Sequence, residues 1–329
     1  MEYGVQLGNL GLSELRDVAQ MAEGLGLHEV SMWDHIVVEG PGRQFNPRDL
    51  AYDPMVMAAT VIGATKKVRV GHLVLCNLFR HPAITARALT SLDQLSGGRL
   101  LAGLGAGWTE REFKMTGIPF PDISVRLRML DEALHCIRSL WTKEQTTFSG
   151  DFYSLKEAIL WPKPLQRPHP PILVGGGGKG LLRVAAKHAD LVNIIPDIGG
   201  PGYLEMANVA KLTDDSVKTK VKFVREQAKH YGRHGEAIRI SNLVYFPILT
   251  DSPAATRATA ESMAPMLQTT PEGVLHSPLT LLGTTEEWAA ELRRRTREWE
   301  VTHVVLSNVS GRFGQAELRR FAEEVIPSV

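Results

Sequence analysis

Residues 4–33 read GVQLGNLGLSELRDVAQMAEGLGLHEVSMW, and this stretch alone predicts a strand, a helix and a second strand in succession. The largely apolar segments at residues 4–7 and 29–33 have the length of short buried strands. Between them, apolar side chains recur at the spacing of one helical face, at Leu15, Val18, Ala19, Ala22 and Leu25. Two strands joined by an amphipathic helix form a β/α unit, in which the strands lie parallel.

The same alternation continues to the end of the chain. Six further strands are predicted, at residues 68–76, 99–103, 171–174, 191–195, 238–249 and 302–306. The intervening and closing helices are predicted to begin at residues 54, 82, 126, 181, 217, 288 and 315. Eight strands that alternate with helices favour an α/β fold of the (β/α)8 TIM-barrel type, in a single domain spanning residues 1–329. Insertions are expected at approximately 36–52, 148–170 and 252–282, where the alternation is interrupted.

The composition excludes several classes of function. The chain has 329 residues with 37 basic and 36 acidic side chains, and this balance gives no reason to expect nucleic acid or a membrane surface as partner. No apolar run of about 18 residues occurs, and the first residues do not resemble a signal peptide. The two cysteines, Cys76 and Cys136, are too few for a disulfide framework, so a cytoplasmic location is expected. The His and Cys spacings typical of metal sites do not occur, and no metal is expected.

Trp33-Asp34-His35 follows the second predicted strand directly. In a TIM barrel, the carboxyl ends of the strands carry the active site. A histidine there can exchange protons near neutral pH, which makes His35 a candidate acid or base. The alternative is an Asp-His pair that only holds a loop in place.

Two glycine-rich segments also follow predicted strands. The segment Gly103-Leu104-Gly105-Ala106-Gly107 lacks the third glycine of a dinucleotide-binding fingerprint, and taken alone it favours a tight turn over a cofactor site. The segment at residues 175–180, GGGGKG, joins an apolar strand to a helix. Bare amides at a helix start bind phosphate, and Lys179 adds positive charge, so this segment predicts a phosphate site. The usual phosphate site of a TIM barrel follows the seventh and eighth strands, so a site after the fifth differs from that pattern.

Taken together, seven segments resemble the luciferase-like monooxygenase superfamily over nearly the whole chain. These segments are residues 33–35, 79–83, 92–99, 103–108 with Glu112 and Phe113, 161–164, 170–177 and 282–284. Within the superfamily, the sequence SGGR at residues 96–99, leading into GLGAGW, most resembles the branch that uses coenzyme F420, an 8-hydroxy-5-deazaflavin. Branches that use FMN carry similar motifs.

The resemblance implies a role for each matched residue. His35 would be the catalytic residue beside the substrate and the reactive ring carbon, with Asp34 near the cofactor ring. The strand end at Leu73, Val74, Leu75 and Cys76 would contain a non-prolyl cis peptide that supports the ring, at Leu73-Val74 or Val74-Leu75. Gly105, Ala106 and Gly107 would lie by the tail or edge of the cofactor, and Gly175, Gly176, Gly177 and Gly178 would hold its phosphate. Trp33, Phe79 and Trp108 would form the wall of the substrate pocket.

The function implied is an F420-dependent oxidoreductase that transfers hydride to or from a small organic substrate. The alternatives are a two-component monooxygenase that receives reduced FMN from a separate reductase, and a non-catalytic cofactor-binding relative of luciferase. The resemblance also implies a homodimer. One position departs from the branch: its glucose-6-phosphate dehydrogenases carry an acidic Glu directly after the glycine segment, where this chain has Trp108.

Overall fold

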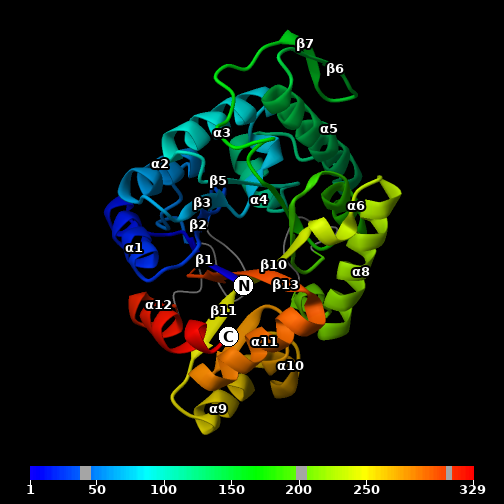
Figure 1. Cartoon of the computed structure of the whole chain (residues 1–329). Coiled ribbons are helices and arrows are strands. Elements are labelled where there is room, and N and C mark those ends of the chain that lie inside the picture. The colour runs from blue at the N-terminus through cyan, green and yellow to red at the C-terminus, as the bar shows by residue number, and fades with distance from the viewer. Residues whose placement is uncertain (38–45, 198–205, 309–312) are drawn as a thin grey trace.

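Eight parallel strands close on themselves at the centre of the structure, and helices surround them (Figure 1). The computed structural model describes residues 1–37, 46–197, 206–308 and 313–329. The predicted (β/α)8 TIM barrel is therefore confirmed. The barrel strands, in their order around the barrel, are β1 (Glu2–Leu7), β2 (Glu29–Met32), β3 (Arg69–His72), β5 (Leu100–Gly105), β8 (Ile172–Gly176), β9 (Leu191–Ile194), β10 (Arg239–Val244) and β13 (Val301–Ser307), and β13 pairs with β1 to close it.

The outer layer consists of helices that follow the barrel strands. The described helices are α1 (Leu12–Gly24), α2 (Pro54–Ala64), α3 (Pro82–Ser96), α4 (Glu110–Thr116), α5 (Ile123–Thr142), α6 (Lys179–His188), α7 (Met206–Ala210), α8 (Asp214–His230), α9 (Pro253–Met263), α10 (Pro271–Leu275), α11 (Thr285–Trp299) and α12 (Gln315–Arg320). Short helical turns follow at Asn77–Phe79, Gly235–Ala237, Phe321–Val325 and Ile326–Ser328. Among the described helices, none is both long and apolar enough to cross a membrane.

Two of the predicted strands are each divided in the structure. The prediction of one strand at residues 68–76 was wrong, because β3 ends at His72 and β4 (Leu75–Cys76) follows after two residues. The prediction of one strand at residues 238–249 was wrong for a different reason. β10 stays in the barrel, whereas β11 (Phe246–Leu249) leaves it and pairs with β12 (Thr280–Gly283) in a separate two-stranded sheet.

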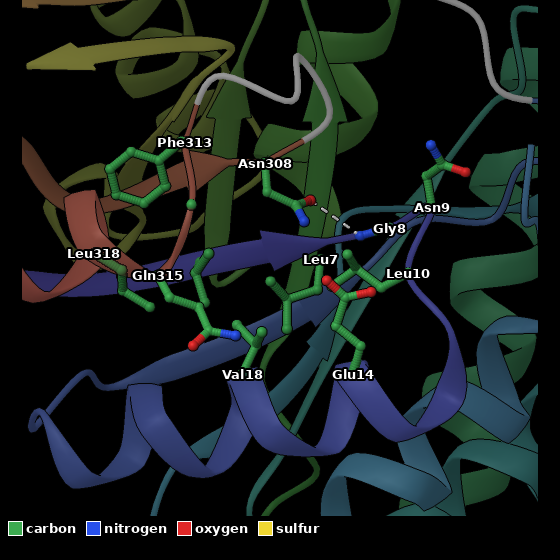
Figure 2. Close-up of a pocket in the computed structure, with 12 residues that line it drawn as sticks. Leu7, Gly8, Asn9, Leu10, Glu14, Val18, Asn308, Phe313, Gln315 and Leu318 are labelled. Atoms are coloured by element: carbon green, nitrogen blue, oxygen red, sulfur yellow. Dashed lines mark hydrogen bonds between the residues drawn. The ribbon is translucent and has the colours of Figure 1, made fainter.

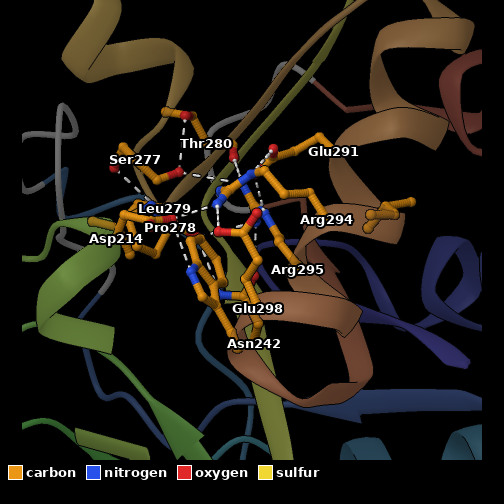
Figure 3. Close-up of polar contacts among 12 residues, drawn as sticks. Asp214, Asn242, Ser277, Pro278, Leu279, Thr280, Glu291, Arg294, Arg295 and Glu298 are labelled. Atoms are coloured by element: carbon orange, nitrogen blue, oxygen red, sulfur yellow. Dashed lines mark hydrogen bonds and ion pairs between the residues drawn. The ribbon is translucent and has the colours of Figure 1, made fainter. Parts of the chain in front are cut away.

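Peripheral elements of the structure overlap two of the ranges at which insertions are expected. An antiparallel hairpin of β6 (Thr146–Ser149) and β7 (Ser154–Ala158) projects beyond α3 and α5, and α9 and α10 lie on the opposite side, outside α11 (Figure 1). The stretch at 36–52 falls partly outside the described residues. One buried side chain ties the region at 252–282 to the barrel. Arg295 of α11 donates to Asn242 Oδ1 of β10 (2.7 Å) and to the carbonyl oxygens of Ser277 and Thr280, so it fixes the start of β12 (Figure 3).

The inside of the barrel is apolar at its middle and charged at its amino-terminal end. Six inward-facing side chains form the apolar layer, namely Leu73, Leu101, Leu173, Leu191, Leu243 and Val305. Below it, Glu2 forms ion pairs with Arg69 and Arg239, which lie at the first positions of β3 and β10. Burial alone would raise the pKa of Glu2, but hydrogen bonds and attraction from the two guanidinium groups outweigh it and lower this pKa to about 2.

We expect the Glu2 carboxylate to make stability depend on acid. Its folded pKa lies below the ordinary value, so its contribution is complete above pH 4.5 and is lost as the pH falls from 4.5 towards 2. Glu2→Gln should lower the free energy of unfolding at pH 7 by about 2 kcal/mol, after allowance for partial solvent exposure. It should also flatten the dependence on pH below 4.5, as measured by urea unfolding. Glu144→Gln, at an exposed site without an ion pair in the described ranges, is the control. Equal acid sensitivity in both variants would contradict this.

Candidate active site

The break between β3 and β4 introduces one extra residue at the carboxyl end of the barrel. Gly71 pairs with Leu101 of β5 and Leu75 pairs with Leu104, so four residues on one strand match three on the other. This is the arrangement of a β-bulge. The Leu73–Val74 peptide bond inside it is cis, as expected from the resemblance. Gln6 Nε2 donates a hydrogen bond to the Leu73 carbonyl oxygen at 2.5 Å.

The Val74 side chain occupies space that only glycines on the neighbouring strands leave open. A Cβ on Gly105 would lie 2.6 Å from Val74 Cγ2, and one on Gly175 would lie 3.1 Å from Cγ1. Gly103 is required as well, because a Cβ there would lie 1.7 Å from the carbonyl oxygen of His72. These glycines let the bulge project into the barrel mouth, where it forms part of the floor.

Asp34 is tied to the same strand end. Its Oδ2 accepts hydrogen bonds from the Cys76 amide (2.9 Å) and from Arg80 Nη1 (2.6 Å), and Arg80 also contacts Asp53, the cap of α2 (2.9 Å). Burial raises the pKa of Asp34, and the Arg80 guanidinium and the Cys76 amide oppose that rise. Asp34 therefore holds β2, the bulge and α2 together at one edge of the mouth.

Two other predicted cofactor residues are packed away from the mouth. Leu75 and Ala106 belong to the core between the barrel and its helices, so only their main chains could reach a ligand. Burial raises the pKa of the Cys76 thiol to about 12, which excludes it as a nucleophile at neutral pH. Gly107 has a φ of 75°, and a Cβ there would lie 2.8 Å from Cys76 Sγ.

His35 is held by the carboxylate of Glu112, for which no role was predicted from the sequence. Its Nδ1 lies 3.1 Å from Glu112 Oε1, and the same oxygen accepts the backbone amides of Ile36 (2.6 Å) and Val37 (3.3 Å). The Glu112 side chain is only 3% exposed, so this contact is shielded from water. Glu112 thus fixes both the loop after β2 and the orientation of the imidazole ring.

The aromatic residues divide into two groups. Trp33 and Trp108 both meet the His35 ring edge to face, with centroids 5.8 Å and 5.5 Å away. Phe79 instead packs on Phe113, at 5.2 Å, behind α4. The structure therefore brings Trp33, His35 and Trp108 together, and it places Phe79 in a separate cluster.

The glycine segment at 175–178 is more crowded than its sequence suggests. A Cβ on Gly176 would lie 2.4 Å from Leu181, and one on Gly177 would lie 2.0 Å from the Ile195 carbonyl oxygen. These two glycines are explained by close packing against α6 and the end of β9. Gly178, the residue before α6, is half-buried and lies next to Asp197, while Lys179 is exposed.

A nearby lysine offsets the charge of Asp197. Lys220 of α8 donates to the Ile195 carbonyl oxygen (3.2 Å), and although burial lowers the pKa of Lys220, Asp197 opposes that effect. The part of the segment that could meet an anion is therefore the start of α6, at Gly178 to Gly180.

A model of the luciferase-like monooxygenase family matches residues 3–304. The chain belongs to this family. An FMNH2-dependent dimethylsulfone monooxygenase from Pseudomonas putida is 31% identical over 175 residues, covering 53% of this chain and 46% of that protein, or about half its length. An F420-dependent glucose-6-phosphate dehydrogenase from Amycolatopsis mediterranei is 29% identical over 242 residues, covering 69% of this chain and 70% of that protein. An F420-dependent secondary alcohol dehydrogenase, solved with an F420-acetone adduct, shares the fold at 22% identity, with a TM-score of 0.77 and coverage of 100% and 98%.

Many residues that carry the family resemblance hold loops rather than face the mouth. The Asp93 carboxylate accepts the amides of Leu165 (2.6 Å) and Gln166 (3.1 Å), and Gln94 donates to the Lys163 carbonyl oxygen (2.7 Å). Arg99 donates to the Val68 carbonyl oxygen (2.6 Å). The contacts of Asp93 and Gln94 join the segment at 92–99 to residues 163–166, far apart in the sequence, into one structural unit.

A cavity of about 230 Å³ lies outside the barrel wall, between β1, α1 and the residues that lead into α12 (Figure 2). Its lining includes Val5, Leu7, Val18, Asn308 and Leu318, and none of the predicted site residues. At its edge, Gly8 separates it from Trp33, because a Cβ on Gly8 would lie 2.3 Å from the Trp33 ring. The cavity and the candidate active site are therefore distinct.

We expect the contact between Val74 and Gly105 to be measurable as an energetic coupling. Gly105→Ala should lower the free energy of unfolding by about 1–3 kcal/mol, because its Cβ would overlap with Val74. Val74→Ala should remove most of that cost in the double variant, as measured by chemical denaturation in a double-mutant cycle. Gly63→Ala, in α2 with open space around its Cβ, is the control and should not destabilise. Additive effects of the two substitutions would show that this packing does not constrain the mouth.

Proposed function

We propose that the protein is an F420-dependent oxidoreductase that transfers hydride between the deazaflavin coenzyme and a small organic substrate. The observation that carries this proposal is the His35–Glu112 pair after β2, next to Asp34, which accepts the Cys76 amide just after the Val74 bulge. A proton-exchanging group next to a shaped floor is what a reaction needs when it moves a hydride and a proton together.

The residues present fit a flavin-type cofactor. The Val74 bulge, accommodated by Gly105 and Gly175, would support a planar ring, and Asp34 would lie beside it. The amides at the start of α6, from Gly178 onward, would hold the phosphate. When bound, the cofactor supplies a ring carbon that accepts or donates hydride.

His35 would move the proton that accompanies the hydride. Because Glu112 engages Nδ1, proton exchange with a substrate hydroxyl or carbonyl oxygen falls to Nε2. The carboxylate of Glu112 would stabilise the imidazolium form when His35 takes a proton. Trp33 and Trp108 would flank the imidazole ring of His35 and keep water away from it.

The second candidate is a monooxygenase that uses reduced FMN from a separate reductase. It is favoured by the 31% identity to the FMNH2-dependent enzyme of Pseudomonas putida. Both cofactors would use the same floor and phosphate site, and they differ beyond the phosphate. F420 continues into a carboxylate-bearing tail, and the exposed Lys179 at the start of α6 favours the more anionic of the two.

The assembly and location of the enzyme belong to the same proposal. Val56, Ile84 and Leu95 are apolar side chains on the packed helices α2 and α3, and each is more than half exposed. Exposed apolar side chains on two neighbouring helices are compatible with a subunit interface, and the homodimer is proposed on the family resemblance together with them. The buried free cysteines Cys76 and Cys136 are compatible with a reducing cytoplasm.

A parallel titration with F420 and with FMN tests the proposed cofactor. We expect F420 to bind at least about tenfold more tightly, with an affinity that falls as salt is added, because its phosphate and tail meet Lys179 and the amides of α6. Lys179→Gln should reduce the affinity for F420 more than that for FMN. Tighter binding of FMN would favour the monooxygenase, and binding of neither cofactor would overturn the proposed function.

The proton-transfer role of His35 is tested on a substrate found by screening secondary alcohols, aldehydes and ketones for a change in F420 absorbance. His35→Ala should lower kcat by about 10²–10⁴-fold with little change in cofactor affinity. Glu112→Gln should lower kcat less, because the ring remains but loses its carboxylate. His234→Ala, an exposed histidine, is the matched control. Unchanged turnover in His35→Ala would make this histidine a structural residue, and failure to find any substrate despite tight binding would favour a non-catalytic cofactor-binding protein.

A further inference from the structure

Four polar side chains form a connected chain inside the barrel that the proposed reaction does not use. Asn193 Nδ2 of β9 donates to Ser241 Oγ of β10 at 3.0 Å, and Ser241 Oγ lies 2.9 Å from His303 Nδ1 of β13. On the other side of its ring, His303 Nε2 lies 2.9 Å from Glu29 Oε2 of β2. All four side chains are at most 1% exposed.

The backbone leaves room for this chain. β1 lies between β13 and β2, and it contributes Gly4 at this level, where a Cβ would lie 3.0 Å from Glu29 Cβ. Gly71 faces Glu29 from the other side, with its Cβ position 3.2 Å from Oε1. Two glycines therefore open the space in which Glu29 crosses to His303.

The donors and acceptors of the chain fix its direction. Glu29 Oε2 and His303 Nε2 make no hydrogen bond in the observed geometry, but a carboxylate 2.9 Å away attracts an N–H, so Glu29 favours a proton on His303 Nε2. The imidazole nitrogen Nδ1 is then an acceptor, and the Ser241 hydroxyl donates to it. Ser241 Oγ must in turn accept from Asn193, which is the orientation observed, with Nδ2 facing Ser241. The side-chain oxygen of Asn193, Oδ1, is left as the acceptor at the end of this hydrogen-bonded series.

Asn193 lies close to the floor of the candidate site. It is the penultimate residue of β9 and pairs with Gly175, whose Cβ position lies 3.8 Å from Asn193 Cβ and 3.1 Å from Val74 Cγ1. Asn193 and Val74 therefore flank the same glycine. Asn193 Oδ1 makes no hydrogen bond within the described part of the chain, and it is not among the fully buried polar atoms that lack a partner. It thus keeps a small accessible surface.

We propose that Asn193 is a cofactor-binding residue, and that its Oδ1 accepts a hydrogen bond from the imide N–H of the cofactor ring. Glu29, acting through His303 and Ser241, is the positioning residue that turns this oxygen, rather than the amide NH2, toward the ligand. The inference rests on the proposed use of a flavin-type cofactor, and it holds for F420 and FMN alike because both rings carry this N–H. It explains why an acid and a histidine, Glu29 and His303, are fully buried inside a barrel that also contains an apolar layer of six side chains.

The affinity of the folded protein for F420 and FMN is the first test. Asn193→Leu keeps the volume but removes the acceptor, and it should weaken binding of the preferred cofactor about tenfold, the effect of one lost hydrogen bond in a shielded site. Glu29→Gln should weaken binding less, since glutamine permits both directions of the chain. Ser31→Ala removes another buried inward hydroxyl of β2, one without a hydrogen bond among the described residues, and should leave the affinity unchanged.

A second measurement reads the direction of the chain without any cofactor. The ¹⁵N shifts of His303, assigned by their loss in His303→Gln, should report a proton on Nε2 alone in the parent protein and a mixture of tautomers in Glu29→Gln. A parent tautomer with its proton on Nδ1, or affinities in Asn193→Leu within twofold of the parent, would overturn the inference while the proposed function stands. If the parent binds neither F420 nor FMN, both fall together.

Discussion

The candidate site depends on the fit of one side chain, Val74, into space that glycines on the two neighbouring strands leave open. Any Cβ at Gly105 or Gly175 would contact Val74 at 2.6–3.1 Å, so the bulge and the glycines require each other. The bulge also brings the Leu73 carbonyl oxygen to Gln6, whose own Oε1 accepts from Ser307 at 3.1 Å. The ends of β13, β1 and β3, which lie along one side of the barrel, are thereby connected at the mouth.

Three acidic side chains inside this barrel each lie against a basic side chain, at three different levels. Glu2 sits between two arginines at the amino-terminal end, Glu29 meets His303 in the interior, and Asp34 meets Arg80 at the mouth. A buried charge without a partner would be costly, so each pair restricts the strands that carry it to one arrangement. The same pairs therefore hold the barrel in register and orient the polar groups near the proposed cofactor.

The sequence predicts the parts of the structure that rest on local pattern, and it fails where distant residues decide. The strand at 171–174 and the helix after it were found from apolar spacing, because their burial repeats with a fixed period. The prediction that Gly176 and Gly177 bind phosphate rested on the local sequence alone. It did not take account of Ile195, whose carbonyl oxygen leaves room only for a glycine at position 177. Glu112 and Arg80 were noted only as part of the family resemblance and were assigned no role for the same reason: their partners lie 77 and 46 residues away, and no periodicity reports such pairs. Besides the resemblance, the signal for Glu112 was an acid next to Phe113 on the buried face of a short helix.

Trp108 stands directly after the glycine segment at 103–107, where the glucose-6-phosphate dehydrogenases of the resembling branch carry an acid, and this difference bears on the proposed chemistry. At that position an acid would stand beside the substrate, whereas Glu112, four residues later, reaches His35 through Nδ1 and the loop amides. Its charge can then act only by orienting and stabilising the imidazole. Trp108 meanwhile lies edge to face with that ring and shields it. On the proposed assignment, proton exchange is concentrated on a single atom, His35 Nε2. A site with one such atom suits a reaction that moves one proton with each hydride, because it needs no second acid to complete the turnover.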